Sequence, residues 1–261
     1  MDLGLKGKRA AVTGSSQGIG FAIAEALARE GCNVAISARD EARLNEAAQK
    51  LGSHGAKIVP IACDLASEDG CRSFIEGAAE SLGGLDILVN NVGGMIPGTL
   101  DSLTPADWER VLNVNLMAAV YTTKFAVGHL KAGKAARILN VSGVSGKQLL
   151  PGSLTTTLPN AAIIGFSKIM AGELGKDGIT VNNICPGLTS TESWVARAEA
   201  MAKVRGVTAD DVRAGIAAQT LLGRWASPQE IGNVAAFLVS EVNSYMTGTT
   251  IEVDGGFNRY I

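Results

Sequence analysis

Short apolar segments alternate along the chain with segments whose apolar residues recur every three or four positions. The short segments are rich in Val, Ile, Leu and Ala, and they predict strands at Ala10–Thr13, Val34–Ser37, Ile58–Cys63, Ile87–Asn90, Ile138–Ser142, Thr180–Cys185 and Thr250–Val253. The helical spacing predicts helices over Ile19–Leu27, Ala42–Leu51, Ile75–Leu82, Asp107–Leu130, Ala161–Leu174 and Pro228–Val239. This alternation predicts an α/β fold, a doubly wound parallel sheet of about seven strands with helices on both faces.

A polar, alanine-rich section at 190–220 interrupts the alternation. Ligands in doubly wound sheets bind beyond the carboxyl ends of the strands. We therefore expect 1–261 to form one domain, with 190–220 as a substrate lobe or lid on that rim.

Composition excludes several classes of function. The chain is 46% hydrophobic with a net charge of −2, so it is neither disordered nor suited electrostatically to nucleic acid or an anionic membrane. No apolar run approaches a membrane span, and the amino terminus has no signal-peptide pattern, so we expect a cytoplasmic protein. The cysteines have no metal-ligand spacing, which predicts reduced thiols and no metal site, at Cys32, Cys63, Cys71 and Cys185. Two histidines exclude a histidine-cluster mechanism.

The glycine-rich run Thr13–Gly20 follows the first predicted strand and opens the first predicted helix. Such a turn lets backbone N–H groups approach a pyrophosphate, whose charge the helix N-terminus favours. This placement predicts a dinucleotide site with contacts from Gly14, Ser16, Gln17, Gly18, Ile19 and Gly20.

Ala38 and Arg39 follow the second predicted strand, where an NAD site would place a carboxylate on the ribose 2′-hydroxyl. A guanidinium there can pair with a 2′-phosphate, so we expect NADP(H) in preference to NAD(H). The alternative is a solvated arginine at a helix entry. After the third strand, Asp64 is placed to accept a hydrogen bond from the adenine amine, and the alternative is a helix N-cap. Leu65 is a further expected cofactor contact.

These and further motifs resemble the short-chain dehydrogenase/reductase family over essentially the whole chain. The matching segments are Thr13–Gly20, Asn90–Gly93, Asn113–Asn115, Pro186–Gly187 and Val253–Gly256. Leu222–Gly256 is especially similar to the 3-oxoacyl carrier-protein reductase branch. The resemblance implies a Rossmann-type fold and NAD(P)-dependent carbonyl/alcohol interconversion on a small-molecule or carrier-bound substrate. It also implies a homotetramer, and it extends the cofactor contacts to Asn91, Gly93, Pro186, Gly187 and Thr191.

The family's catalytic serine, tyrosine and lysine are absent from the expected positions. No Y-x-x-x-K occurs, because Phe125 and Thr249 stand four residues after Tyr121 and Tyr245, and Tyr260 is next to last. Gly165–Lys168 and Gly178–Asn182 match a stretch that the family carries after its active site. Counting back without gaps then assigns Asn160 to the lysine, Thr156 to the tyrosine and Gly143 to the serine. Asn140–Gly143 supports this register, and Asn115 alone is retained.

A threonine hydroxyl is a far weaker acid than a phenol, and Gly143 has no side chain to hold an oxyanion. Five nearby residues are candidate substitutes on two loops, although a solvated role is favoured for each: Ser142, Ser145, Lys147, Thr155 and Thr157. Three functions stay open. They are an NADP(H)-dependent oxidoreductase with a divergent active site, a catalytically impaired sensor or partner subunit in a hetero-oligomer with an active homologue, and a lyase or isomerase on the same scaffold.

Overall fold

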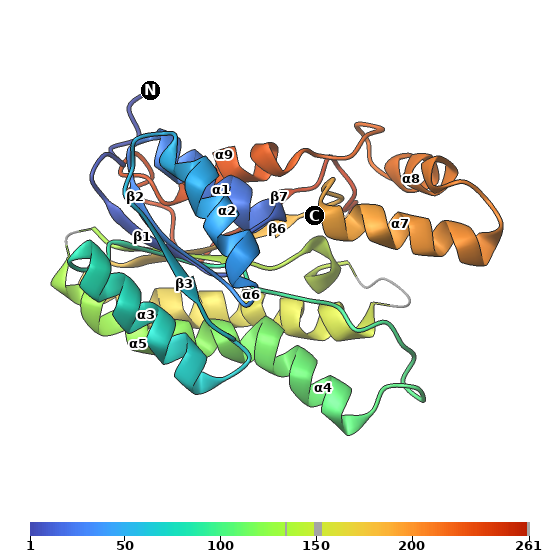
Figure 1. Ribbon diagram of the computed structural model, residues 1–261, viewed down its shortest axis with the longest axis horizontal. Helices are drawn as coiled ribbons and strands as arrows, with labels where there is room; N and C mark the ends of the chain where they lie inside the picture. The colour runs from blue at the N-terminus through green and yellow to red at the C-terminus, as the bar shows by residue number, and fades with distance from the viewer. Residues whose placement is uncertain (134, 149–152, 260–261) are drawn as a thin grey trace.

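A computed structural model describes residues 1–133, 135–148 and 153–259. Their core is one parallel seven-stranded sheet in the order β3-β2-β1-β4-β5-β6-β7 (Figure 1). The strands are β1 (Arg9–Val12), β2 (Asn33–Ala38), β3 (Ile58–Ala62), β4 (Ile87–Asn90), β5 (Arg137–Val141), β6 (Thr180–Pro186) and β7 (Thr250–Val253). The predicted fold class is confirmed. The strand order reverses between β1 and β4, which is where such a sheet opens a ligand crevice.

Helices cover both faces of the sheet, as Figure 1 shows. One face carries α1 (Gly18–Arg29), α2 (Glu41–Gly52) and α9 (Pro228–Leu238), and the other carries α3 (Glu68–Leu82), α5 (Ala118–Ala132) and α6 (Leu154–Leu174). Successive strand residues point to opposite faces, so Ala10 and Val12 join one hydrophobic core while Ala11 joins the other. This is why β1 is apolar on both faces after Arg9.

The predicted helix at Asp107–Leu130 is interrupted in the structure. It consists of α4 (Pro105–Leu112), the π-helical turn η1 (Asn113–Met117) and α5. Single π-helical turns inside α-helices often occur at functional sites. Here η1 contains Asn115, the residue retained from the family pattern.

Residues 190–220, which interrupt the predicted alternation of strands and helices, form two helices that the sequence did not indicate, α7 (Glu192–Arg205) and α8 (Ala209–Ala217). They extend beyond the edge of the sheet in Figure 1. Of the residues in α7, only Ala198 and Ala202 are buried, so the helix lacks a wide apolar stripe. That weak pattern explains why its sequence does not indicate a helix.

Helix α6 begins at Leu154, seven residues before the predicted start at Ala161. Thr155 and Thr157 therefore lie in the helix, and their expected placement on a loop is wrong. The helix contains Pro159, which cannot donate a hydrogen bond to the Thr155 carbonyl one turn earlier. The Asn115 amide donates to that carbonyl instead, at 3.3 Å, and so compensates for the proline.

No helix among the described residues is long and apolar enough to cross a membrane.

Candidate cofactor-binding and active site

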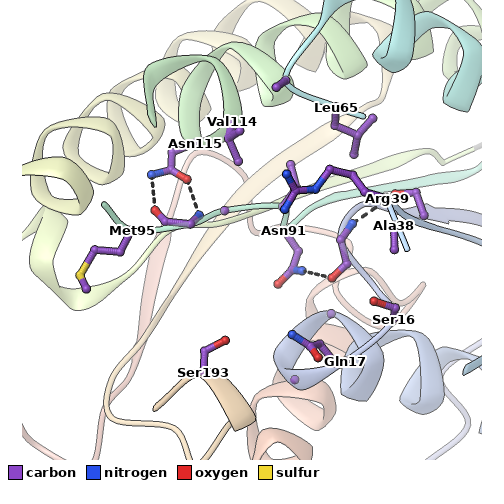
Figure 2. A pocket seen from close by; sticks show the side chains of 18 of the residues that line it. Ser16, Gln17, Ala38, Arg39, Leu65, Asn91, Met95, Val114, Asn115 and Ser193 are labelled. Atoms are coloured by element: carbon purple, nitrogen blue, oxygen red, sulfur yellow. Dashed lines mark hydrogen bonds between the residues drawn. The ribbon is translucent and has the colours of Figure 1, made fainter. Parts of the chain in front are cut away.

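A cavity of about 500 Å³ opens at the carboxyl ends of β1, β2, β3 and β4. Its walls combine the loops after these strands with η1 and the start of α7 (Figure 2). The lining includes these residues predicted from the sequence: Gly14, Ser16, Gln17, Gly18, Ile19, Gly20, Arg39, Asp64, Leu65, Asn91, Gly93, Asn115 and Thr191. Residues that are remote in the sequence thus meet at the crevice between β1 and β4.

The glycine-rich turn requires glycine at three positions. Gly14 and Gly18 adopt φ values of +61° and +60°, which side chains disfavour, and a Cβ on Gly20 would overlap the Gly14 carbonyl oxygen. Gln17 occupies the N-cap position of α1, but its side chain does not cap the helix. Its Oε1 accepts a hydrogen bond from Arg43 Nη1 instead, at 2.9 Å. The first N–H groups of α1 therefore lack a side-chain cap at the cavity, an arrangement that suits an anion.

Thr13 and Asn91 join the glycine-rich turn to the loop after β4. The Asn91 side chain donates to the carbonyl oxygens of Thr13 and Gly14, both at 3.0 Å. The Thr13 hydroxyl oxygen accepts from the backbone N–H groups of Asn91 and Val92, at 2.8 and 3.0 Å. Two walls of the cavity are thereby fixed to each other.

Arg39 is exposed at the cavity rim, and it makes no hydrogen bond or ion pair within the described parts of the chain. Its neighbour Ala38 adds no charge, and Figure 2 shows both beside the glycine-rich turn. A guanidinium without a protein partner suits an anionic ligand group at this end of the cavity.

Asp64 lines the cavity and does not cap α3. The cap of α3 is Ser67, whose hydroxyl oxygen accepts from the Gly70 N–H, so the alternative of an Asp64 cap is wrong. The Asp64 carboxylate accepts only from the Ala66 N–H among the hydrogen bonds of the described residues. Burial, reinforced by the charge of Asp64, raises the pKa of the neighbouring Cys63 to about 11, so this thiol stays protonated.

Asn115 fastens η1 to the loop after β4. Its side chain donates to the Gly94 carbonyl at 2.7 Å and accepts from the Gly94 N–H at 2.6 Å (Figure 2). Together with the bond to the Thr155 carbonyl, this asparagine joins the loop, η1 and α6. It therefore holds one wall of the cavity beside the expected catalytic position.

Gly143, Thr156 and Asn160 lie outside the cavity lining but close to one another. A Cβ on Gly143 would be 3.0 Å from Asn160 Nδ2, so the two positions face each other. Thr156 and Asn160 are one turn apart on α6, and the Thr156 hydroxyl donates to the Ser153 carbonyl at 3.1 Å. Asn160 Nδ2 donates to Ser145 Oγ at 2.9 Å.

Pro186 and Gly187 also lie outside the lining. Pro186 is the last residue of β6 and Gly187 follows it, where a Cβ on Gly187 would be 2.6 Å from Asp254 Cα. Further along the chain, Thr191 lies next to the glycine-rich turn. Its Cγ2 would be 3.4 Å from a Cβ on Gly18.

Sequence reasoning missed part of the lining, namely Met95, Ile96, Arg110, Val111, Val114, Glu192 and Ser193. The spacing of 110, 111, 114 and 115 places them on one side of a helical stretch, and that periodicity was the available signal. The described residues contain no group of His, Cys, Asp and Glu side chains that could hold a metal ion.

The doubly wound sheet and the cavity at its reversal point define a dinucleotide-binding α/β protein. Residues 14–258 match the family model described as enoyl-(acyl carrier protein) reductase. The chain is 35% identical over 254 residues to a 3-oxoacyl-[acyl-carrier-protein] reductase of Escherichia coli, covering 97% of this chain and 98% of that one. It belongs to the short-chain dehydrogenase/reductase family.

Two solved structures extend the comparison. L-sorbose reductase from Gluconobacter frateurii, complexed with NADPH and L-sorbose, is 35% identical with a TM-score of 0.97, and all of each chain is covered. A short-chain dehydrogenase from Burkholderia cenocepacia in complex with NADP is 32% identical with a TM-score of 0.87, covering 98% of this chain and 99% of that one.

Proposed function

We propose that this protein is an NADP(H)-dependent oxidoreductase that interconverts a carbonyl and an alcohol at a divergent active site. The observation that carries the proposal is the cavity itself. It combines a glycine-rich turn that only small residues fit, an uncapped helix N-terminus and the free guanidinium of Arg39. Both solved relatives described above are bound to the phosphorylated form of the dinucleotide.

The preference for NADP(H) over NAD(H) rests on Ala38 and Arg39. Asp or Glu at the end of β2 would repel a 2′-phosphate, whereas Arg39 can form a charge-assisted pair with it. In this proposal Gly14, Gly18 and the start of α1 hold the pyrophosphate, Asp64 and Leu65 lie beside the adenine, and Thr191 lies beside the nicotinamide.

NADPH, when bound, supplies a hydride to the carbonyl carbon, and the carbonyl oxygen takes up one proton to give the alcohol. The chain must bind that oxygen and admit the proton, yet Gly143 offers no side chain and Thr156 only a weakly acidic hydroxyl. Because general acid catalysis typically contributes ~10²–10⁴-fold, turnover by this chain should be slow for its family.

A small polyhydroxylated ketone is the first substrate class to test, because the L-sorbose reductase superposes with a TM-score of 0.97 over the full length of both chains. A 3-oxoacyl thioester is the second, because of the similarity to carrier-protein reductases. We assign residues 190–220, which form α7 and α8, to the substrate lobe of the single domain.

The second candidate is a protein that binds NADP(H) without redox turnover and acts as a sensor or partner subunit. The replacements at Gly143, Thr156 and Asn160 favour it. Assembly as a homotetramer, or with an active homologue, would cover apolar side chains on α6 that are exposed in the isolated chain: Leu158 is 52% exposed and Ile169 60%.

The discriminating experiment follows NADPH oxidation at 340 nm with L-sorbose and acetoacetyl-coenzyme A, beside a fluorescence titration of NADPH binding. Turnover of either ketone above the protein-free rate supports the oxidoreductase. Tight NADPH binding with no turnover of a broad ketone panel supports the second candidate. Absence of NADPH binding contradicts both.

A further inference from the structure

Five polar residues near Gly143 could take over the role of a carbonyl-binding hydroxyl, and the structure separates them. Lys147 is ion-paired with Glu252, and the Thr155 hydroxyl donates to the Ile96 carbonyl at 2.8 Å. Thr157 is buried and its hydroxyl shares a hydrogen bond with that of Ser153 at 2.9 Å. These three side chains are already engaged in contacts within the fold.

Ser142 is engaged as well. Its hydroxyl is 3.0 Å from Cys185 Sγ and accepts a hydrogen bond from Asn183 Nδ2 at 2.9 Å. Cys185 and Asn183 are buried in β6, so the Ser142 hydroxyl points into the sheet. It therefore belongs to a packed network between β5 and β6 and does not face a substrate.

Ser145 is the exception. Its Oγ accepts a hydrogen bond from Asn160 Nδ2 at 2.9 Å, and its own O–H donates to no acceptor within the described residues. Ser145 Oγ would also lie 4.0 Å from a Cβ on Gly143, close to the space that a serine hydroxyl at 143 would use. Both Ser145 and Asn160 are partly exposed.

We propose that Ser145, oriented by Asn160, donates the hydrogen bond that holds the substrate's carbonyl oxygen. Because the Asn160 amide donates to Ser145 Oγ, it occupies a lone pair of that oxygen and leaves the Ser145 proton available to a ligand. Asn160 is then a positioning residue. Ser145 holds the oxygen and keeps its own proton, and the alkoxide takes up a different proton, from water. This inference rests on the proposed oxidoreductase function.

The replacements at positions 143 and 160 depend on each other sterically. A side chain at 143 would crowd Asn160 Nδ2, since its Cβ would be only 3.0 Å away. The glycine therefore makes room for the amide, and the amide fixes the new hydroxyl. In this proposal the replacements at Gly143 and Asn160 act together with Ser145.

A matched pair of variants tests the hydroxyl while keeping the shape. Ser145→Thr retains the hydroxyl, and Ser145→Val is isosteric with it but cannot donate. We expect Ser145→Val to lower kcat with NADPH and L-sorbose by roughly 10²-fold relative to Ser145→Thr, as is typical for loss of one oxyanion donor. NADPH affinity, measured by fluorescence titration, should be equal in both. Acetoacetyl-coenzyme A is the second probe.

A second readout does not need turnover. L-sorbose binding to protein saturated with NADP⁺, followed by saturation-transfer NMR, should be roughly 3- to 10-fold weaker for Ser145→Val than for Ser145→Thr. Asn160→Asp should weaken turnover as well, because a carboxylate would accept the Ser145 proton and withdraw it from the substrate.

The outcomes separate the two claims. Equal kcat and equal probe binding for Ser145→Thr and Ser145→Val overturn the role of Ser145, even where the wild-type chain is an active reductase. No turnover, but probe binding that depends on the hydroxyl, overturns the reductase and retains Ser145 as the ligand contact. A wild-type chain that binds NADPH but neither probe contradicts both.

Discussion

Arg39 stands at the end of β2 with no acidic partner in the described residues, next to an alanine where a carboxylate would select NAD. Single side chains at this position should therefore control the choice of dinucleotide. Glu192 also lines the cavity, and its Oε2 would lie 3.8 Å from a Cβ on Gly18. The charge balance around the cavity thus includes an acidic residue near the glycine-rich turn.

Replacing Arg39 should weaken NADPH binding selectively. Arg39→Ala removes a charge-assisted hydrogen bond worth about 1.5–3 kcal/mol, so the Kd for NADPH should rise by roughly 10- to 100-fold while the Kd for NADH stays constant. Ala38→Asp should reverse the preference by repelling the 2′-phosphate. Calorimetric titration with both dinucleotides measures this, and an equal effect of Arg39→Ala on both would remove Arg39 from the 2′-phosphate site.

At the scale of elements, α6 and η1 show how a local irregularity is compensated. Pro159 leaves the Thr155 carbonyl without its helical donor, and Asn115 supplies one from η1. The early start of α6 was not predictable from local sequence, because a run of β-branched threonines followed by proline favours a non-helical segment. The strands were predictable, since their apolar character on both faces follows from their burial.

A double-mutant cycle tests the compensation. Asn115→Ala should destabilise the wild-type chain by about 1–2 kcal/mol, but by less in the Pro159→Ala background, where position 159 regains a donor for the Thr155 carbonyl. Asn115→Ala also removes the hydrogen bonds to Gly94, but this loss is the same in both backgrounds and cancels in the difference between the two unfolding free energies. Urea unfolding measures the four free energies, and strictly additive changes would mean that Asn115 does not compensate for Pro159.

The starts of β1 and β4 are joined by an ion pair with a predictable pH dependence. Asp86 accepts hydrogen bonds from Arg9 N, Nε and Nη2 at 3.0, 2.8 and 2.8 Å. Burial pushes the pKa of Asp86 upwards, but these bonds outweigh it and hold that pKa below its ordinary value of 3.8. The pair therefore stabilises the fold above that value, and its contribution is lost as the pH falls through the lowered pKa.

Asp86→Asn should consequently cost about 1–3 kcal/mol of unfolding free energy at pH 7 and progressively less below about pH 4. Urea unfolding of both proteins across this range gives the difference. A deficit that stays constant with pH would contradict an ionic role for Asp86.

Across the whole molecule, the cofactor part of the site is more predictable from the sequence than the part around Ser145 and Asn160. The glycine-rich turn, Arg39 and Asn91 were predictable because their place after consecutive strands brings them to one edge of the sheet. Glu192 was not, because a lone charged residue on a helix looks like solvated surface. The pairing of Ser145 with Asn160 likewise depends on how α6 packs, which no local pattern encodes.

Restoring the family pattern should be strongly non-additive. Gly143→Ser alone should give little gain, since Thr156 and Asn160 still lack the phenol and the ammonium of the family pattern. Gly143→Ser combined with Thr156→Tyr and Asn160→Lys should raise kcat with NADPH and L-sorbose by roughly 10²–10⁴-fold. A folded triple variant no faster than the wild type would show that the catalytic positions are misassigned.

We propose that the chain holds a site for the phosphorylated dinucleotide, whatever its rate of turnover. Parallel calorimetric titrations of the wild-type protein with NADPH and NADH test it most directly. We predict one saturable NADPH site per chain, with NADPH bound at least about tenfold more tightly than NADH, in keeping with one charge-assisted hydrogen bond at Arg39. Equal affinities, or no binding of either dinucleotide, would contradict this account.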